Sequence, residues 1–114
     1  MTLLLVALGG GLGSAVRYLA ARYVVPYRSF PVATFVVNIS GCLILGMVSG
    51  AAMSAQLFAL FGTGFCGGLT TYSTFAVESV GLARIRRTVT SLLYVVASVG
   101  AGLGAAWLGF RWTY

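Results

Sequence analysis

The 114-residue chain contains very little charge, since only 7% of its residues are Asp, Glu, Lys or Arg. Soluble domains carry about 25% charged residues. A chain this poor in charge cannot cover a surface that faces water, and its mean hydropathy of +1.01 points the same way. We therefore predict an all-α integral membrane protein.

The groups that most enzymes use are also missing. The chain has no histidine and one acid, Glu78, so it has no Ser/His pair, no Cys/His pair and no carboxylate pair. The glycines near the N-terminus lie in an apolar run and not after a soluble strand, so they do not indicate a nucleotide site. Cys42 and Cys66 lie in apolar stretches without a C-x-x-C motif, and we expect packing roles for both. We do not expect an enzyme.

The seven basic residues are all arginine and give a net charge of +6. They stand mainly at the ends of apolar runs rather than in one patch, which argues against nucleic acid as a partner. Arginine at the ends of spans is typical of contact with lipid headgroups. The expected partner of these side chains is the lipid bilayer.

Hydrophobic residues make up 60% of the chain, which is long enough for four spans of about 20 residues. The predicted spans are residues 2–24, 32–53, 57–83 and 88–110, within a single membrane domain covering residues 1–114. The first segment has no basic n-region and continues as a full span, so we expect no cleavable signal peptide. The expected location is the cell inner (plasma) membrane, as a multi-pass protein.

Short connections between these spans make neighbouring helices antiparallel, so both arginine-bearing connections lie on one side of the membrane. Arg111 lies on the other side. The positive-inside rule predicts cytoplasmic connections and external termini. The arginines of the cytoplasmic side are Arg22, Arg28, Arg84, Arg86 and Arg87.

The third span contains a break at Gly64–Phe75 (GFCGGLTTYSTF), which is rich in glycine and hydroxyl groups. Lipid offers no partner to loosened backbone groups, so such a break must be packed in protein or line a watery cavity. Breaks of this kind also place half-helix ends and bare carbonyls next to ions. We predict a helix broken near the membrane midplane beside an ion pathway.

Polar side chains recur on the spans at helical spacing. Thr34 and Asn38 share one face, as i and i+4, and could form either an interhelical clamp or an ion site. Arg17 could snorkel to the interface or attract anions into a vestibule. On the third span, Tyr72 and Phe75 could be core residues or line a pathway.

Two further features leave alternatives open. Glu78 follows at i+6 from Tyr72 and could carry protons, bind an ion or pair with an arginine. On the fourth span, Tyr94, Ser98 and Gly102 form a stripe that could hold two neighbouring helices together. Together the spans offer mainly hydrogen-bond donors and positive ring edges, which suit a small anion held weakly at several points.

The chain resembles the CrcB/Fluc family of small four-helix fluoride channels over nearly its whole length. The run GFCGGLTTYSTF is the most specific part of the match. Two other runs support it, Gly9–Tyr18 (GGGLGSAVRY) and Thr34–Gly41 (TFVVNISG). The resemblance implies a passive channel that exports cytoplasmic fluoride and gives fluoride resistance. It also implies an antiparallel dimer with two pores at its interface.

The resemblance further implies roles for individual residues. A structural Na⁺ at the dimer interface would be held by the backbone carbonyls of Gly67 and Thr70 from each protomer. Glu78 borders the pathway, and Gly102 occupies a position of the fourth-helix track. The residues implied to line the fluoride pathway are Asn38, Tyr72, Phe75, Thr34, Tyr94, Ser98 and Arg17.

The chain departs from the family pattern at two places. Tyr72 stands where phenylalanine is commoner, and Gly102 stands where a hydroxyl is usual. Five arginines are expected on the cytoplasmic side and one on the other, and this bias favours one orientation of the chain in the membrane. The partner in the dimer is either a second copy or a homologous sister subunit. Two rival hypotheses are a small proton-coupled exporter with Glu78 as proton carrier and a non-transporting accessory subunit.

Overall fold

The computed structural model describes residues 2–25, 30–51 and 53–114. Three helices are long and apolar enough to cross a membrane, and they match three of the predicted spans closely. The described helices are α1 (Thr2–Tyr23), α2 (Val32–Gly50), α3 (Ala55–Phe58), the π-helical η1 (Ala59–Cys66), α4 (Gly67–Leu69), α5 (Tyr72–Arg84) and α6 (Thr88–Thr113). Arg28 lies outside the described residues.

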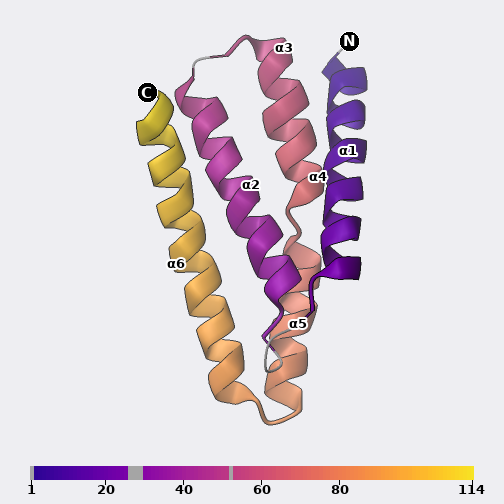
Figure 1. Cartoon of the computed structure of the whole chain (residues 1–114), viewed down its shortest axis with the longest axis vertical. Helices are drawn as coiled ribbons and strands as arrows, with labels where there is room; N and C mark the ends of the chain where they lie inside the picture. The colour runs from indigo at the N-terminus through magenta and orange to yellow at the C-terminus, as the bar shows by residue number, and fades with distance from the viewer. Residues whose placement is uncertain (1, 26–29, 52) are drawn as a thin grey trace.

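The helices form an elongated bundle of 47 × 27 × 20 Å. Figure 1 shows α6 beside α2, and η1 and α4 of the third predicted span between α2 and α1, whereas α5 packs against α6. Both termini lie at one end of the bundle, and the turn between α5 and α6 lies at the other. This placement agrees with the predicted antiparallel order of neighbouring helices.

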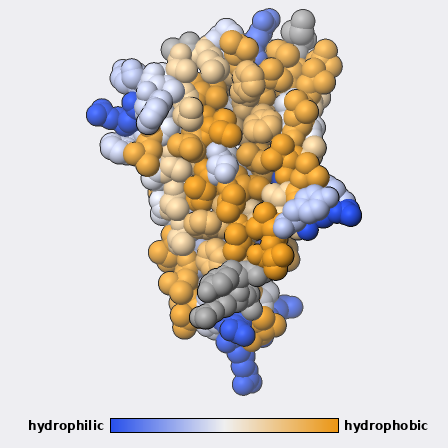
Figure 2. Space-filling view, in the orientation of Figure 1, coloured by the Kyte–Doolittle hydropathy of each residue, from blue (hydrophilic) through white to orange (hydrophobic). Residues whose placement is uncertain are grey.

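The face of the bundle that Figure 2 shows is largely apolar. Leu3, Leu92 and Trp107 are among many large hydrophobic side chains that are more than half exposed. Such a surface is unfavourable in water and is what a lipid-facing bundle presents. Together with the three apolar helices, it supports the prediction of a multi-pass membrane protein.

The helices pack closely because glycines stand where their backbones meet. A Cβ atom added at Gly9 would collide with the Leu60 carbonyl, and one at Gly13 with the Phe65 carbonyl, so α1 rests directly on η1. Gly46 of α2 meets the backbone of α6 at Ala106 in the same way. Close contact between small residues is the usual way in which membrane helices associate.

The third predicted span, residues 57–83, is not one helix. It is π-helical from Ala59 to Cys66 and then breaks at Thr70 and Thr71, where the backbone is extended (ψ 157° and 120°). The break falls within the predicted motif and lies midway along the bundle in Figure 1. The predicted break is therefore present as a bend between α4 and α5.

The C-terminal end of α5 closes in a Schellman motif. The Arg87 N–H donates to the Leu82 carbonyl (2.8 Å), and the Arg86 N–H donates to the Ala83 carbonyl (3.2 Å). The residue at C′ is Arg86, with φ 63°, a left-handed conformation that glycine usually supplies. A side chain there costs about 1–2 kcal/mol.

Candidate functional site

The site is built around the side chain of Asn38, which closes the break. The Asn38 Oδ1 accepts a hydrogen bond from the Thr71 N–H (2.8 Å), and its Nδ2 donates to the Thr71 carbonyl (3.2 Å). The Asn38 amide thus replaces the two backbone hydrogen bonds that the Thr71 N–H and carbonyl would make in a continuous helix. The structure shows an interhelical clamp made to the backbone of the break, and the same side chain lines the groove beside it.

The two threonines of the break complete this local structure. The Thr71 hydroxyl caps α5 by accepting from the Thr74 N–H (3.2 Å), and the Thr70 hydroxyl donates to the Cys66 carbonyl (2.8 Å). Threonine hydroxyls near a helix end compete with the backbone in this way. The hydroxyl-rich sequence therefore ends one helix and begins the next.

The break has a consequence for the carbonyls of Gly67 and Thr70. In a continuous helix they would accept from the N–H groups of Thr71 and Thr74. Those N–H groups instead donate to Asn38 Oδ1 and to the Thr71 hydroxyl. Two carbonyl oxygens, the hard ligands that Na⁺ and similar ions prefer, have thereby lost their helical partners.

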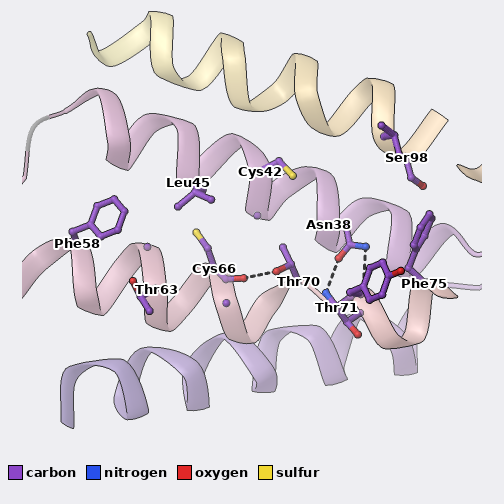
Figure 3. A pocket seen from close by; sticks show the side chains of 15 residues that line it. Asn38, Cys42, Leu45, Phe58, Thr63, Cys66, Thr70, Thr71, Phe75 and Ser98 are labelled. Carbon is purple, nitrogen blue, oxygen red and sulfur yellow. Dashed lines mark hydrogen bonds between the residues drawn. The ribbon is translucent and has the colours of Figure 1, made fainter. Parts of the chain in front are cut away.

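A groove of about 560 Å³ lies along one side of the break, between α2, η1 and the N-terminal end of α5. Figure 3 shows Asn38, Thr71 and Phe75 at one end of it and Phe58 at the other. Its lining is Asn38, Gly41, Cys42, Leu45, Phe58, Gly62, Thr63, Cys66, Gly67, Thr70, Thr71, Tyr72, Phe75, Ser98 and Val99. The structure thus brings six of the predicted site residues together: Asn38, Gly67, Thr70, Tyr72, Phe75 and Ser98.

Two hydroxyl side chains of the groove stand out. The Ser98 oxygen is buried and has no hydrogen-bond partner among the described residues. Buried hydroxyls are normally paired, so an unpaired one needs an explanation such as a ligand or water. Tyr72 is 81% exposed although it lies at mid-bundle, with its ring centroid 6.5 Å from that of Phe75.

Tyr94 does not line the groove and is fully buried behind Phe75, with 5.0 Å between the two ring centroids. Its hydroxyl donates to Glu78 Oε1 (3.1 Å). Glu78 therefore has a tyrosine as its partner. Gly102 lies further along α6, where an added Cβ would meet the sulfur of Cys42 at 3.3 Å.

Arg17 and Thr34 lie in a second hollow of about 310 Å³ on the α1 side of α2. Ser14, Tyr18 and Thr74 also line it. Thr71 lines both hollows, so the break separates a cationic hollow from the groove. Apart from the buried Tyr94, the predicted site residues thus fall into two groups, one in each hollow.

Three contributors were not among the predicted site residues. The Thr71 N–H donates to Asn38, and the Cys66 carbonyl accepts a hydrogen bond from the Thr70 hydroxyl. The Phe30 ring packs edge-on against Tyr94, with ring centroids 5.3 Å apart. Thr71 had a detectable signal, a hydroxyl residue directly before a helical stretch. Phe30 lies in a connection, and no periodic pattern marks it.

The comparisons with known proteins agree with one another. A profile of the family described as "CrcB-like protein, Camphor Resistance (CrcB)" matches residues 4–110. The chain is 75% identical over 113 residues to "Fluoride-specific ion channel FluC 2" of Rhodococcus jostii (strain RHA1), which covers 99% of both chains. It is 45% identical over 105 residues to "Fluoride-specific ion channel FluC 1" of Ligilactobacillus salivarius (strain UCC118), covering 91% of this chain and 92% of the relative.

A third relative, "Fluoride-specific ion channel FluC" of Flavobacterium psychrophilum, is 43% identical over 115 residues, covering 95% of this chain and 93% of the relative. These matches extend over the break, Asn38 and both hollows and are not confined to one motif. The chain therefore belongs to the CrcB family of membrane proteins, as its sequence motifs predicted.

Proposed function

We infer that this chain is a fluoride-specific ion channel that lets cytoplasmic fluoride leave the cell passively. The observation that carries this function is the groove beside the break, where the amide of Asn38, the hydroxyls of Ser98 and Tyr72 and the ring of Phe75 meet. Hydrogen fluoride crosses membranes as a neutral molecule and ionises inside. An inside-negative potential then drives the anion out by about 2.3 kcal/mol per 100 mV.

The fluoride pathway in this proposal follows the residues of the groove. Asn38, Ser98 and Tyr72 supply donors, and the Phe75 ring supplies a positive edge. Arg17 and Thr34 draw the anion into the second hollow, and Tyr94 supports Phe75 from behind. The unpaired Ser98 hydroxyl in the groove supports this assignment.

We further propose that two chains pair in antiparallel orientation over the groove. Tyr72 is 81% exposed, and the polar backbone of the break lies beside it. Polar backbone at membrane depth must be buried in protein or line a cavity, and a second chain over this face would enclose the groove in that way. That chain is a second copy or a homologous sister subunit.

A structural Na⁺ fits the carbonyls of Gly67 and Thr70 in such a pair. Both have lost their helical donors at the break, and Gly67 is exposed in the groove with open space around its Cα. Two carbonyls from each chain would give four oxygen ligands. The ion would supply a fixed positive charge at the centre of the assembly.

Flux from vesicles tests the function. Purified protein is reconstituted into liposomes loaded with potassium fluoride, and external fluoride is measured with an electrode. We expect fluoride to leave when valinomycin lets potassium follow, without any proton gradient. Liposomes loaded with potassium chloride should release no chloride, and equal release of the two halides would contradict the proposal.

The same assay separates the rival functions. A proton-coupled exporter with Glu78 as carrier would need a proton gradient, and an accessory subunit would pass no fluoride at all. The Tyr94 hydroxyl donates a hydrogen bond to the Glu78 carboxylate within the bundle. This contact gives Glu78 a role within the bundle and does not favour the exporter.

A further inference from the structure

The turn between α5 and α6 carries Arg84, Arg86 and Arg87 within four residues. All three are exposed, and they lie at the end of the bundle opposite the termini (Figure 1), where hydrophilic side chains gather in Figure 2. The neighbouring Ile85 and Val89 are 64% and 71% exposed. The turn thus combines three cations with apolar side chains that also face outward.

These arginines have no acidic side chain within the chain to neutralise them. Glu78 is the only Asp or Glu in the sequence, and its Oε1 accepts from the fully buried Tyr94. The C-terminal carboxylate lies at the other end of the bundle (Figure 1). These three neighbouring cations can therefore attract a negative partner from outside the chain.

The backbone of the turn gives an independent indication. Arg86 stands at the C′ position of the Schellman motif with φ 63°, where glycine would adopt the same conformation without strain. Strained backbone is found most often at functional positions. The guanidinium of Arg86 is therefore a candidate binding group.

We propose that Arg84, Arg86 and Arg87 form a binding site for the phosphate of an anionic phospholipid. Guanidinium groups bind phosphate with two parallel hydrogen bonds, and basic residues next to membrane helices attract anionic lipids. Ile85 and Val89 lie beside the site and contact the acyl region of the same lipid. A soluble anion would make no favourable contact with these two apolar side chains.

Phosphatidylglycerol titrated into the full-length protein in detergent tests the site, with binding followed by microscale thermophoresis. Each arginine near a charged membrane surface contributes about 1 kcal/mol, so we expect R86Q to weaken binding about fivefold and R84Q/R87Q about 25-fold. The matched control is R111Q, an exposed arginine at the other end of the bundle, which should bind like the parent. Equal affinity in all four proteins would overturn the proposal.

Arg86→Gly separates the two roles of Arg86. Without anionic lipid this variant should unfold at a temperature about 4 °C higher, because glycine relieves the strain. With phosphatidylglycerol it should bind as weakly as R86Q. Unchanged phosphatidylglycerol affinity in this variant would refute the assignment of Arg86.

Two further titrations examine the source of the phosphate. Phosphatidylcholine should bind far more weakly than phosphatidylglycerol, and inorganic phosphate should not compete at equal concentration. Equal binding of phosphatidylcholine would show that anionic charge is not recognised. Full competition by inorganic phosphate would show a general anion site instead of a lipid site.

Discussion

Asn38 connects two parts of the molecule that the helix break would otherwise separate. Its amide satisfies both the N–H and the carbonyl of Thr71, at 2.8 and 3.2 Å. Neither hydrophobic burial nor helix propensity can supply these two hydrogen bonds at membrane depth. The break is therefore stable only because a residue with a donor and an acceptor stands on the facing helix.

Replacing Asn38 by alanine should destabilise the protein by about 1–3 kcal/mol, because two partly buried backbone groups lose their partners. The thermal unfolding temperature of purified protein in detergent measures this loss. Ser49→Ala, at an exposed position of the same helix, is the matched control and should unfold like the parent. If the two variants unfold alike, the break does not depend on Asn38.

Phe75 is the aromatic residue most clearly placed to act on the ion, since it lines the groove and rests on the buried Tyr94. Phe75→Ile removes the positively polarised ring edge while keeping an apolar side chain. We expect fluoride flux from liposomes to be lost, with an unchanged elution volume in size-exclusion chromatography.

The control for this experiment is Phe61→Ile. Phe61 is 42% exposed on η1 and does not line either hollow, so its flux should equal that of the parent. Unchanged flux in Phe75→Ile would mean that the pore-lining face of α5 has been assigned wrongly.

At the scale of elements, α1 and η1 depend on glycine for their contact. An added Cβ at Gly9 would lie 2.8 Å from the Phe65 nitrogen, besides its collision with the Leu60 carbonyl, whereas Gly11 has open space. We expect Gly9→Ala to destabilise the protein by about 1–3 kcal/mol. Thermal unfolding in detergent measures the change.

Gly11→Ala is the matched control on the same helix. Alanine replaces glycine there without a steric penalty, and a helix gains about 0.5–1 kcal/mol from this exchange. The two variants should thus change the unfolding temperature in opposite directions. A similar decrease in the unfolding temperature of both variants would show that α1 is sensitive to added side chains on every face.

The sequence predicted the long helices well because hydropathy alone determines them. The first and last spans, expected at residues 2–24 and 88–110, are the helices Thr2–Tyr23 and Thr88–Thr113. The glycine and threonine content of residues 64–75 also located the break. These signals are local in sequence and need no knowledge of packing.

Other features depend on contacts between distant residues and could not be predicted. The π-helical residues 59–66 have a composition that suits an ordinary helix equally well. The hydrogen bonds from Asn38 to Thr71 join residues 33 positions apart. The separation of Arg17 and Thr34 from the groove follows from how α2 lies between the two hollows.

For the whole molecule, the distribution of arginine determines how the chain enters the membrane. Arg22 lies in the last turn of α1. The turn between α5 and α6 carries Arg84, Arg86 and Arg87, while Arg111 lies near the termini at the other end of the bundle. Positive charge of this kind holds connections in the cytoplasm. The chain should consequently favour one orientation, with the α5–α6 turn inside.

Labelling of a single cysteine measures this orientation. Cys42 and Cys66 are first replaced by alanine, and Thr88→Cys then places one thiol at the exposed turn. In intact cells a membrane-impermeant maleimide should leave this thiol unlabelled, and it should react after the cells are opened. A matched thiol near the other end, Trp112→Cys, should react from outside, because Trp112 is 85% exposed there.

If half of each thiol reacts in intact cells, the chain inserts in both orientations and pairs with itself. If the predicted one-sided labelling is found, an antiparallel channel requires a sister chain of opposite orientation.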